Sequence, residues 1–171
     1  MSVIVRPARP EEYEALGRIT VGAYHAADQI AAGTGYDAEL ADCASRAAGA
    51  DLLAAVDDET GAVLGGVTFC LPGSPYAELA RPDEAEFRML AVDPAAQGRG
   101  VGAALVAECV ARAARAGRRG LVLCTRDTNS AAQRLYERFE FEPDPARDWA
   151  PVPGVTLLAW RRQVEVAAEA G

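Results

Sequence analysis

Residues 85–106 read AEFRMLAVDPAAQGRGVGAALV, and the rest of the chain is organised around this stretch. Its first part predicts a strand that ends at Val92, because Asp93-Pro94 interrupts the ladder: proline lacks a backbone donor and aspartate favours turns. A glycine-spaced loop, Gln97 to Gly102, then opens directly into a helical pattern. Unpaired backbone N–H groups and the positive end of a helix dipole meet at such a junction. The stretch therefore predicts a phosphate or pyrophosphate site, to which Arg99 adds a positive charge.

Length and charge limit the classes of function. The 171 residues are enough for one domain with a sizeable core, and half of them are hydrophobic. The 17 basic residues against 25 acidic ones give a net charge of −8, which argues against nucleic acid as a partner. An acidic balance suits a cationic acceptor such as an amine, and it serves solubility equally well.

The N-terminus and the cysteines indicate a cytoplasmic protein. Charge and proline come too early for a signal peptide, and no apolar run approaches the length of a membrane span. The four cysteines lack C-x-x-C spacing and His25 is the only histidine, so we expect free thiols and no metal site.

Local patterns predict the elements before and after the central stretch. The expected segments are a strand at 3–6, a helix from Pro10, a second helix capped by Asp37 and running to about Ala48, strands at 52–56 and 62–69, a loop at 71–82, helices at about 100–116 and 130–138, strands at 121–124, from Phe141 and at 155–160, and an ordered loop at 149–154. This order indicates a mixed α/β domain with helices on both faces of one sheet. We expect the domain to span residues 1–162, followed by a partly mobile tail at 163–171.

Two motifs together resemble the GNAT N-acetyltransferases. The strand, the Asp93-Pro94 turn and the loop QGRGVG at 97–102 are similar to that family's acetyl-CoA-binding motif. About thirty residues later, NSAAQRLYERFEF at 129–141 is similar to its second motif. The resemblance covers roughly residues 3–161. One departure is Glu140, which stands where the family usually has glycine, so a left-handed turn there would strain it.

The resemblance implies a GNAT-like fold and a binding site for acetyl-CoA. The central sheet would be mostly antiparallel and would splay between its fourth and fifth strands. Pantetheine would then bond to the backbone of Leu90, Ala91 and Val92 like an added strand. The amides of Gln97, Gly98, Arg99, Gly100, Val101 and Gly102 would hold the pyrophosphate, and Asn129 would fix the pantetheine or the mouth of the strands. A backbone N–H near Leu90–Ala91 would polarise the thioester carbonyl.

Taken alone, the glycine loop has a simpler explanation as an ordinary tight turn. The second motif shifts the balance towards cofactor binding. A dinucleotide site is disfavoured, since the spacing is G-x-G-x-G and the loop follows the fourth predicted strand rather than the first.

Acyl transfer to an amine needs a proton acceptor, and Glu86 on the central strand is the candidate. Strand periodicity places Glu86 and Arg88 on one side and Phe87 and Met89 on the other. Arg88 could therefore neutralise Glu86, leaving a structural salt bridge, or could bind a carboxylate on the acceptor. A solvated strand glutamate is the alternative for Glu86.

Tyr136 is the candidate acid for the departing thiolate, because the resemblance places its hydroxyl near the thiol. A core tyrosine with a satisfied hydroxyl is the alternative. Cys124 ends a predicted strand near the cleft, where a covalent acetyl-cysteine is conceivable and an inert buried thiol is favoured.

The acceptor side is defined only weakly. Its candidate residues are Tyr24, His25, Asp28, Tyr36, Tyr76, Glu78 and Arg88, and His25 also fits a capping role. The leading hypothesis is an acetyl-CoA-dependent N-acetyltransferase acting by direct attack in a ternary complex. The alternatives are a longer acyl group, a hydroxyl acceptor, or a silent acetyl-CoA-binding sensor or interaction domain. The acceptor would be a small molecule or a peptide amine, and the family analogy admits a homodimer.

Overall fold

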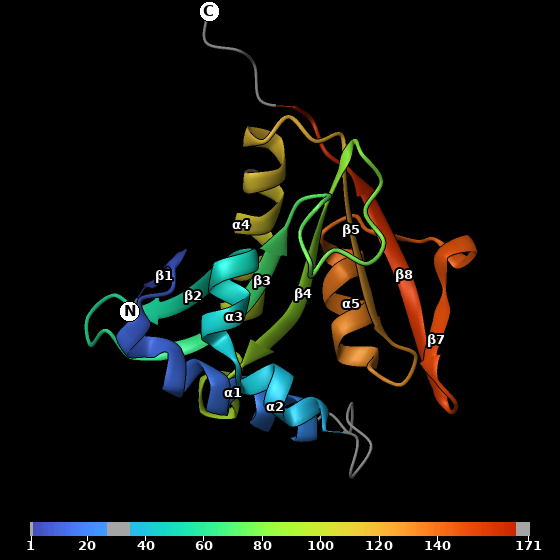
Figure 1. The fold of residues 1–171 in the computed structure, drawn as a ribbon. Helices are drawn as coiled ribbons and strands as arrows, with labels where there is room; N and C mark the ends of the chain where they lie inside the picture. The colour runs from blue at the N-terminus through green and yellow to red at the C-terminus, as the bar shows by residue number, and fades with distance from the viewer. Residues whose placement is uncertain (1, 27–34, 167–171) are drawn as a thin grey trace, which may run out of the picture.

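The computed structural model describes residues 2–26 and 35–166, and one open sheet of eight strands forms its centre (Figure 1). The strands are β1 (Val3–Pro7), β2 (Asp51–Asp57), β3 (Val63–Cys70), β4 (Glu84–Val92), β5 (Gly120–Arg126), β6 (Glu142–Pro143), β7 (Trp149–Val152) and β8 (Val155–Gln163). They follow the order β1-β2-β3-β4-β5-β8-β6, with β7 paired to β8. Only β4 and β5 pair in parallel, so the sheet is mostly antiparallel.

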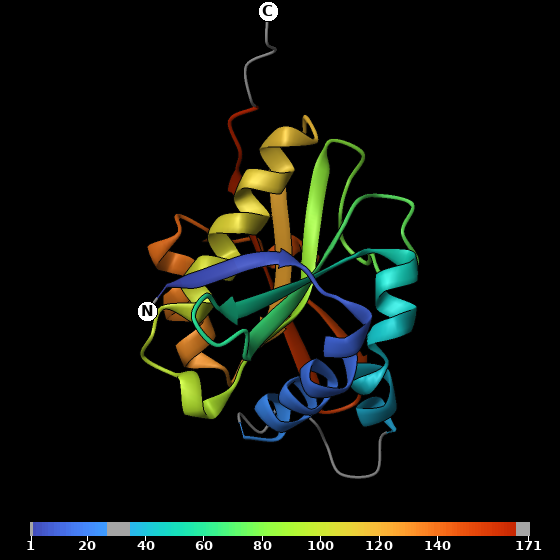
Figure 2. The same cartoon turned by 90° about the vertical axis from the view of Figure 1, so that its left-hand side faces the viewer.

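Helices cover both faces of this sheet (Figure 2). They are α1 (Tyr13–Ala26), α2 (Tyr36–Ala41), α3 (Cys43–Gly49), α4 (Val101–Arg115) and α5 (Ser130–Arg138), with short 3-10 turns at Pro10–Glu12, Pro94–Ala96 and Pro145–Arg147. The helices α1 to α3 lie on one face, and α4 and α5 lie on the other. The predicted mixed α/β architecture is therefore confirmed. Within the described ranges, no helix has the length and apolar character that a membrane crossing requires.

The core between the sheet and α4 follows the predicted helical face. Val101, Leu105, Val106 and Cys109 are buried there, as their spacing requires.

On β4, alternate side chains point to opposite faces, and Phe87 turns towards α5. Its ring lies 5.9 Å from that of Tyr136, measured between centroids, so an aromatic cluster joins the strand to the helix.

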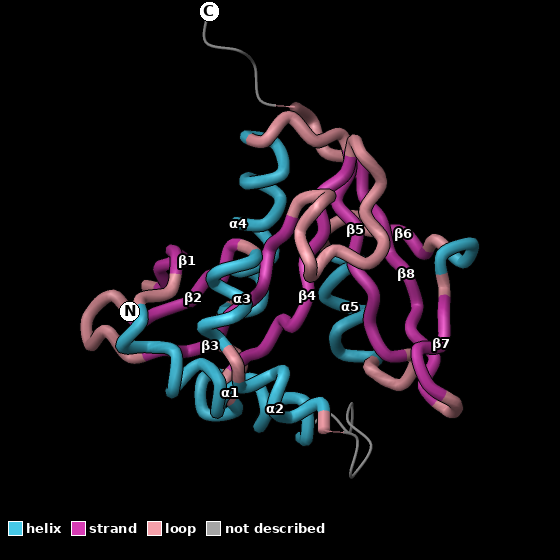
Figure 3. Tube along the Cα trace, viewed as in Figure 1, coloured by secondary structure: helices cyan, strands magenta, loops and turns pink. Residues whose placement is uncertain are grey.

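The sheet opens between β4 and β5, as the resemblance implied (Figure 3). The two strands pair only over Glu84–Glu86 on β4 and Gly120–Val122 on β5. Met89 then has a φ of 57°, and the register between β3 and β4 shifts at this point. This β-bulge bends β4, so the strand continues to Val92 paired with β3 alone. One edge of its second half is consequently free to accept a ligand.

Two predicted segments differ from the structure. The prediction that Asp37 caps the second helix is wrong, because that helix begins after Gly35 and breaks at Asp42. The Asp42 carboxylate accepts a hydrogen bond from the Ser45 backbone N–H and starts a separate helix, α3. The expected loop at 149–154 is also wrong, since Trp149–Val152 forms β7 against β8. At the other end of this hairpin, β8 runs to Gln163.

Candidate functional site

The glycine loop presents unpaired amides in front of α4. Gly98 and Gly100 have φ values of 82° and 76°, a left-handed conformation that side chains with a Cβ rarely adopt. Gly100 is the N-cap of α4 and has no capping side chain. Within the described ranges, no protein acceptor takes a hydrogen bond from the amides of residues 98–103. These donors stand at the positive end of a 15-residue helix, and they fit an anionic group such as a pyrophosphate.

Two residues assigned to the cofactor already have protein partners. Arg99 Nη2 lies 3.0 Å from Asp57 Oδ2, so this guanidinium ties the loop to the end of β2. Hydrogen bonds from the Glu59 and Thr60 amides, together with Arg99, keep the pKa of Asp57 below its usual value against the effect of burial. Asn129 caps α5 by accepting from the Ala132 amide at 3.2 Å. Its side-chain oxygen is therefore already engaged in capping the helix.

The free edge of β4 runs from the bulge to Val92. Leu90 and Val92 are partly exposed, whereas Ala91 is buried. On the paired edge, the chain approaches β3 so closely that an added Cβ at Gly65 would stand 2.4 Å from the Ala91 carbonyl oxygen. The absence of a side chain at Gly65 lets β3 pair closely with Ala91 and Val92 of β4. The opposite edge keeps its backbone groups for an added strand-like ligand.

A cavity of about 450 Å³ lies at the mouth of the opening between β4 and β5. Met89 and Cys124 form its inner end, and two aromatic side chains, Tyr24 and Tyr36, cover it from α1 and α2. Its charged lining residues are Glu39, Glu78, Arg88 and Arg126. Four of the predicted acceptor residues therefore meet here: Tyr24, Tyr36, Glu78 and Arg88.

Other predicted acceptor residues lie elsewhere. His25 Nε2 approaches Asp37 Oδ2 at 2.9 Å, and both side chains are about half exposed. This surface pair agrees with the simpler reading of His25. Tyr76 packs over Gly49, where an added Cβ would lie 3.0 Å from the Tyr76 ring, and neither His25 nor Tyr76 lines the cavity. Asp28 lies outside the described residues.

One wall of the cavity had no signal in the sequence. Trp149, Pro151 and Val152 on β7, with Val155 and Leu157 on β8, form this side. The sequence predicts an ordered loop over residues 149–154, and none of its side chains is among the predicted acceptor residues. Alternation over four residues containing a proline is too short and too irregular to mark a strand.

Glu86 occupies a different environment from the one predicted. It is 0% exposed, and its carboxylate accepts hydrogen bonds from the backbone N–H groups of Glu78, Leu79 and Ala80 at 2.8–3.1 Å. These donors compensate the buried charge, so the side chain fixes the loop that follows β3. Its role as a base stays a prediction, and the geometry favours a structural anchor.

Arg88 pairs with Glu78 and not with Glu86. Arg88 Nε lies 2.9 Å from Glu78 Oε1, and Arg88 Nη1 donates to the Tyr76 carbonyl at 3.2 Å. The suggested neutralisation of Glu86 by Arg88 is therefore wrong, since a loop residue lies closer than the neighbour two positions away. Burial raises the pKa of Glu78, and the charge of Arg88 partly offsets this rise.

Tyr136 packs against Phe87 and Phe141 and lies close enough to Cys124 for the two groups to interact electrostatically. Burial raises the pKa of Tyr136 above its usual value, and the nearby Cys124 adds to the rise. Burial also raises the pKa of Cys124 to about 12, with Glu78 contributing further. The thiolate of Cys124 is therefore scarce at neutral pH, which favours an inert thiol over an acetyl-cysteine intermediate.

The start of β4 carries an ion cluster that sequence reasoning missed. Glu84 is 1% exposed and binds Arg147 at 2.7 Å and Arg161 at 2.6 Å. Burial alone would raise its pKa, but the hydrogen bonds from Arg147, the Arg81 amide and Arg161 hold it at about 2. The cluster fixes β4 against β8 and the turn at 145–147. Three residues this far apart in sequence give no local pattern.

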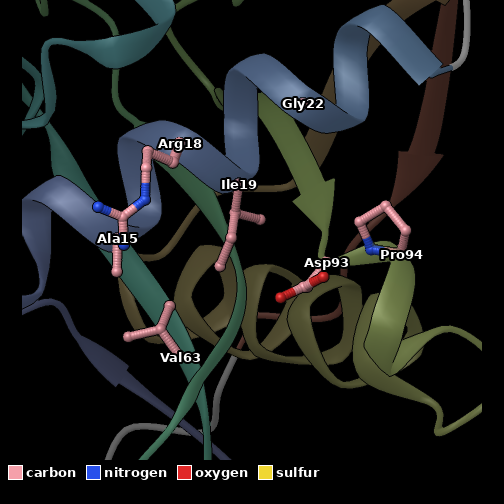
Figure 4. A pocket seen from close by; sticks show the side chains of 7 residues that line it. All are labelled: Ala15, Arg18, Ile19, Gly22, Val63, Asp93 and Pro94. Atoms are coloured by element: carbon pink, nitrogen blue, oxygen red, sulfur yellow. The ribbon is translucent and has the colours of Figure 1, made fainter.

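A second cavity, of about 400 Å³, lies between α1 and the ends of β3 and β4 (Figure 4). Its charged lining residues are Arg18 and Asp93, and none of the predicted site residues lines it. Asp93 is engaged in capping the turn at Pro94–Ala96. The chemistry-bearing side chains therefore belong to the cavity at the mouth of β4 and β5. Among the described residues, no group of His, Cys, Asp and Glu is arranged to hold a metal ion.

Solved structures share this fold. A GNAT-family acetyltransferase from Staphylococcus aureus Mu50 has a TM-score of 0.74 at 14% identity, covering 96% of this chain and 100% of that one. A GCN5-related N-acetyltransferase from Kribbella flavida is 26% identical, with a TM-score of 0.69 over 95% and 98% of the two chains. The yncA protein of Salmonella typhimurium, described as an acetyltransferase and solved with its cofactor acetyl-CoA, is 22% identical. Its TM-score is 0.66, with 100% and 99% of the chains covered.

Sequence comparison agrees with the fold. No curated protein matches the chain. The family model for the acetyltransferase (GNAT) family matches residues 15–141, which include the glycine loop, the bulged strand and the motif around Tyr136. This chain therefore belongs to the GNAT family of acetyltransferases.

Proposed function

We propose that this protein transfers an acetyl group from acetyl-CoA to a primary amine by direct attack within a ternary complex. The observation that carries the proposal is the continuous path from the unpaired amides of residues 98–103, along the free edge of β4, to the cavity beside Met89. The anion site fits the pyrophosphate of acetyl-CoA, the strand edge fits its pantetheine, and the cavity fits the acceptor amine.

Each part of the path has a role in this scheme. The amides of Gly98 to Gly102 bind the pyrophosphate, whereas the predicted Gln97 amide already donates to the Pro94 carbonyl. The backbone of Leu90 to Val92 binds the pantetheine as an added strand. A backbone N–H at the bulge stabilises the oxyanion. Asn129, which caps α5 just after β5, supports the mouth of the strands. The acetyl-CoA complex of the Salmonella structure supports this choice of cofactor.

Tyr136 serves as a neutral hydrogen-bond donor to the departing sulfur. Its raised pKa keeps the phenol protonated at neutral pH. An ordinary thiol has a pKa of about 8.5, so full proton transfer from this phenol to a thiolate would be uphill. A hydrogen bond that strengthens as sulfur gains charge stabilises the leaving group without that cost. We do not extend the proposal to Glu86 as base, because backbone amides engage its carboxylate.

The anion site can be tested by two variants that match in shape and differ in charge. An added Cβ at Gly100 meets nothing within 4 Å, and asparagine and aspartate both tolerate its left-handed backbone. Gly100→Asp places a carboxylate at the proposed pyrophosphate site, whereas Gly100→Asn places a neutral amide there. We expect Gly100→Asp to bind acetyl-CoA at least about tenfold more weakly than Gly100→Asn, measured by titration calorimetry. Equal affinities would show that the anion binds elsewhere.

The activity itself is tested with acetyl-CoA and a panel of amines. The panel contains n-butylamine, α-amino acids, a polyamine, an aminoglycoside and short peptides, with acetylated product detected by mass spectrometry. Product from at least one amine supports the proposal. Binding of acetyl-CoA without product from any amine would instead favour a sensor domain, and product from a hydroxyl compound alone would change the acceptor class.

A further inference from the structure

The segment from Tyr76 to Ala80 is held rigidly over the acceptor cavity. Glu86 accepts from the amides of Glu78, Leu79 and Ala80, while Arg88 Nη1 donates to the Tyr76 carbonyl. Arg147 Nη1 donates to the Leu79 carbonyl at 3.2 Å. Three side chains from outside the loop thus fix its backbone. A loop anchored in this way presents its own side chains in defined positions.

Glu78 is the side chain that this anchored loop presents to the cavity. Its backbone N–H binds Glu86, and its carboxylate points to Arg88 at the cavity wall. The side chain is 29% exposed, so the carboxylate is partly desolvated and still reachable from the cavity. Glu86 is fully buried, and its oxygens have backbone partners. Of these two acids, Glu78 alone lines the cavity where an acceptor would lie.

We infer that Glu78 is the general base that takes the proton from the acceptor amine, and that Glu86 is a positioning residue acting through the loop amides. The inference rests on the proposed acetyltransferase function and names a residue within that site. Its structural basis is the shared cavity of Glu78, Met89 and Cys124 at the opening of the sheet.

The proton balance assigns one transfer to Glu78. The acceptor arrives as an ammonium ion and gives one proton to the Glu78 carboxylate. The freed lone pair forms the N–C bond to the thioester carbonyl carbon while the C–S bond breaks. The tetrahedral nitrogen gives its second proton to solvent, and the departing thiolate, to which Tyr136 donates a hydrogen bond, takes one proton from solvent and leaves as the thiol. Glu78 then releases its proton to solvent, so the enzyme returns to its starting charge.

The groups around Glu78 predict how its titration responds to substitution. Arg88 and Glu86 face it from β4, Glu39 and Tyr36 from α2, and Cys124 from β5. Cys70 on β3 also lies within its electrostatic reach. Arg88 lowers the pKa of Glu78, so Arg88→Gln moves that pKa upward. Glu39 raises it, so Glu39→Gln moves the pKa downward. Since a base acts when deprotonated, the acidic limb of kcat/KM shifts in the same two directions.

The test compares the acidic limb of the pH profile of kcat/KM across four variants, with n-butylamine and the best acceptor of the panel as probes. We expect Glu78→Gln to lose the limb and to lower kcat by about 10²–10⁴-fold. Arg88→Gln moves the limb to higher pH and Glu39→Gln to lower pH. Glu86→Gln lowers kcat but keeps the limb, because it disturbs the loop and leaves the base in place. Glu11→Gln, at an exposed position of the turn at Pro10–Glu12, is the control with unchanged kinetics.

A second readout uses no acetyl-CoA. Side-chain carboxyl ¹³C resonances of the labelled protein are followed against pH, and the resonance missing from Glu78→Gln identifies Glu78. Its midpoint is expected above that of an ordinary glutamate and higher still in Arg88→Gln. This measurement needs no turnover, so it also applies to folded variants that have lost activity.

The outcomes separate the inference from the proposed function. A limb that disappears in Glu86→Gln and persists in Glu78→Gln would make Glu86 the base and overturn the inference. A limb unmoved by both Glu78→Gln and Arg88→Gln would also overturn it, with acetyl transfer intact. Failure of the wild-type protein to acetylate any amine would instead overturn the proposed function, and this inference with it.

Discussion

Replacing Glu140 by glycine should stabilise the protein, because a side chain with a Cβ stands in a left-handed turn. The Phe141 amide bonds the Tyr136 carbonyl and the Glu140 amide bonds the Glu137 carbonyl, each at 3.0 Å. These two bonds form a Schellman motif at the end of α5. Glu140, with a φ of 65°, occupies the position that normally requires glycine. The helix α4 ends in the same motif, with Gly117 at a φ of 71°.

The expected gain follows from two opposing contributions. A left-handed residue with a Cβ costs about 1–2 kcal/mol relative to glycine. Glycine in turn has more conformational freedom in the unfolded chain, which offsets about 0.4–1 kcal/mol. The Glu140 side chain is 83% exposed and lies 3.8 Å from Arg162, so its ion pair contributes little. The net gain is about 0.5–1 kcal/mol, which corresponds to a rise in Tm of about 1–4 °C.

Differential scanning calorimetry and urea unfolding measure this gain, and α4 supplies a matched reciprocal control. An added Cβ at Gly117 meets nothing within 4 Å, so Gly117→Glu introduces the same backbone strain without a clash. We expect Gly117→Glu to lower stability by about the amount that Glu140→Gly raises it. A Tm that falls or stays constant in Glu140→Gly, while Gly117→Glu is destabilised, would refute the reasoning. The local contacts of α5 would then compensate the strain.

The remaining predictions concern catalysis and the buried ion cluster. Tyr136→Phe should lower kcat by about 10–100-fold, the loss of one hydrogen bond to a charged sulfur, with little change in the Kd for acetyl-CoA. Unchanged turnover, once chemistry is shown to limit the rate, would remove Tyr136 from the mechanism. Glu84 has a folded pKa of about 2 against an ordinary 4.5, so its stabilising effect is complete above about pH 4.5 and is lost as the pH falls towards 2. In urea unfolding, the stability difference between wild type and Glu84→Gln should shrink by about 3 kcal/mol over that range, and a constant difference would contradict the assigned pKa.

The parts of the site made by contiguous residues could be predicted from the sequence. The strand, the turn at Asp93-Pro94, the glycine loop and the start of α4 follow one another in the chain, and each has a local cause. The structure adds that Gly98 and Gly100 in this loop have left-handed conformations. The effect of Glu140 on its turn could likewise be anticipated, because a single backbone conformation decides it. The opening of β4 from β5 came from the resemblance, since no residue pattern encodes a bulge at Met89.

The acceptor cavity could not be predicted in the same way, because distant segments form it. Its walls come from α1, α2, the loop after β3, and the hairpin of β7 and β8. Tyr24, Tyr36 and Glu78 were named from the sequence, and the structure brings them together. His25 was also named, but it lies at the surface with Asp37. Residue type and place in the chain did not distinguish the residues that line the cavity from those that do not.

The side chains at positions 84, 86 and 88 show why correct periodicity did not lead to correct partners. All three lie on one face of β4, as alternation requires, and this placement suggested Glu86 or an acceptor carboxylate as the partner of Arg88. Cα atoms two positions apart on a strand are separated by about 6–7 Å, so a side chain from a loop that covers the same face can lie closer than the next residue on that face. Glu84 therefore pairs with Arg147 and Arg161, Glu86 with backbone amides, and Arg88 with Glu78. Backbone donors have no sequence signature, so the partners of Glu86 could not be predicted. The role that we propose for Glu78 could not be predicted either, because it depends on those partners. A fully buried carboxylate on a central strand needs hydrogen-bond donors, and Glu86 finds them in the loop amides. Because these amides occupy Glu86, the proposed base is Glu78 on the loop and not Glu86 on the strand.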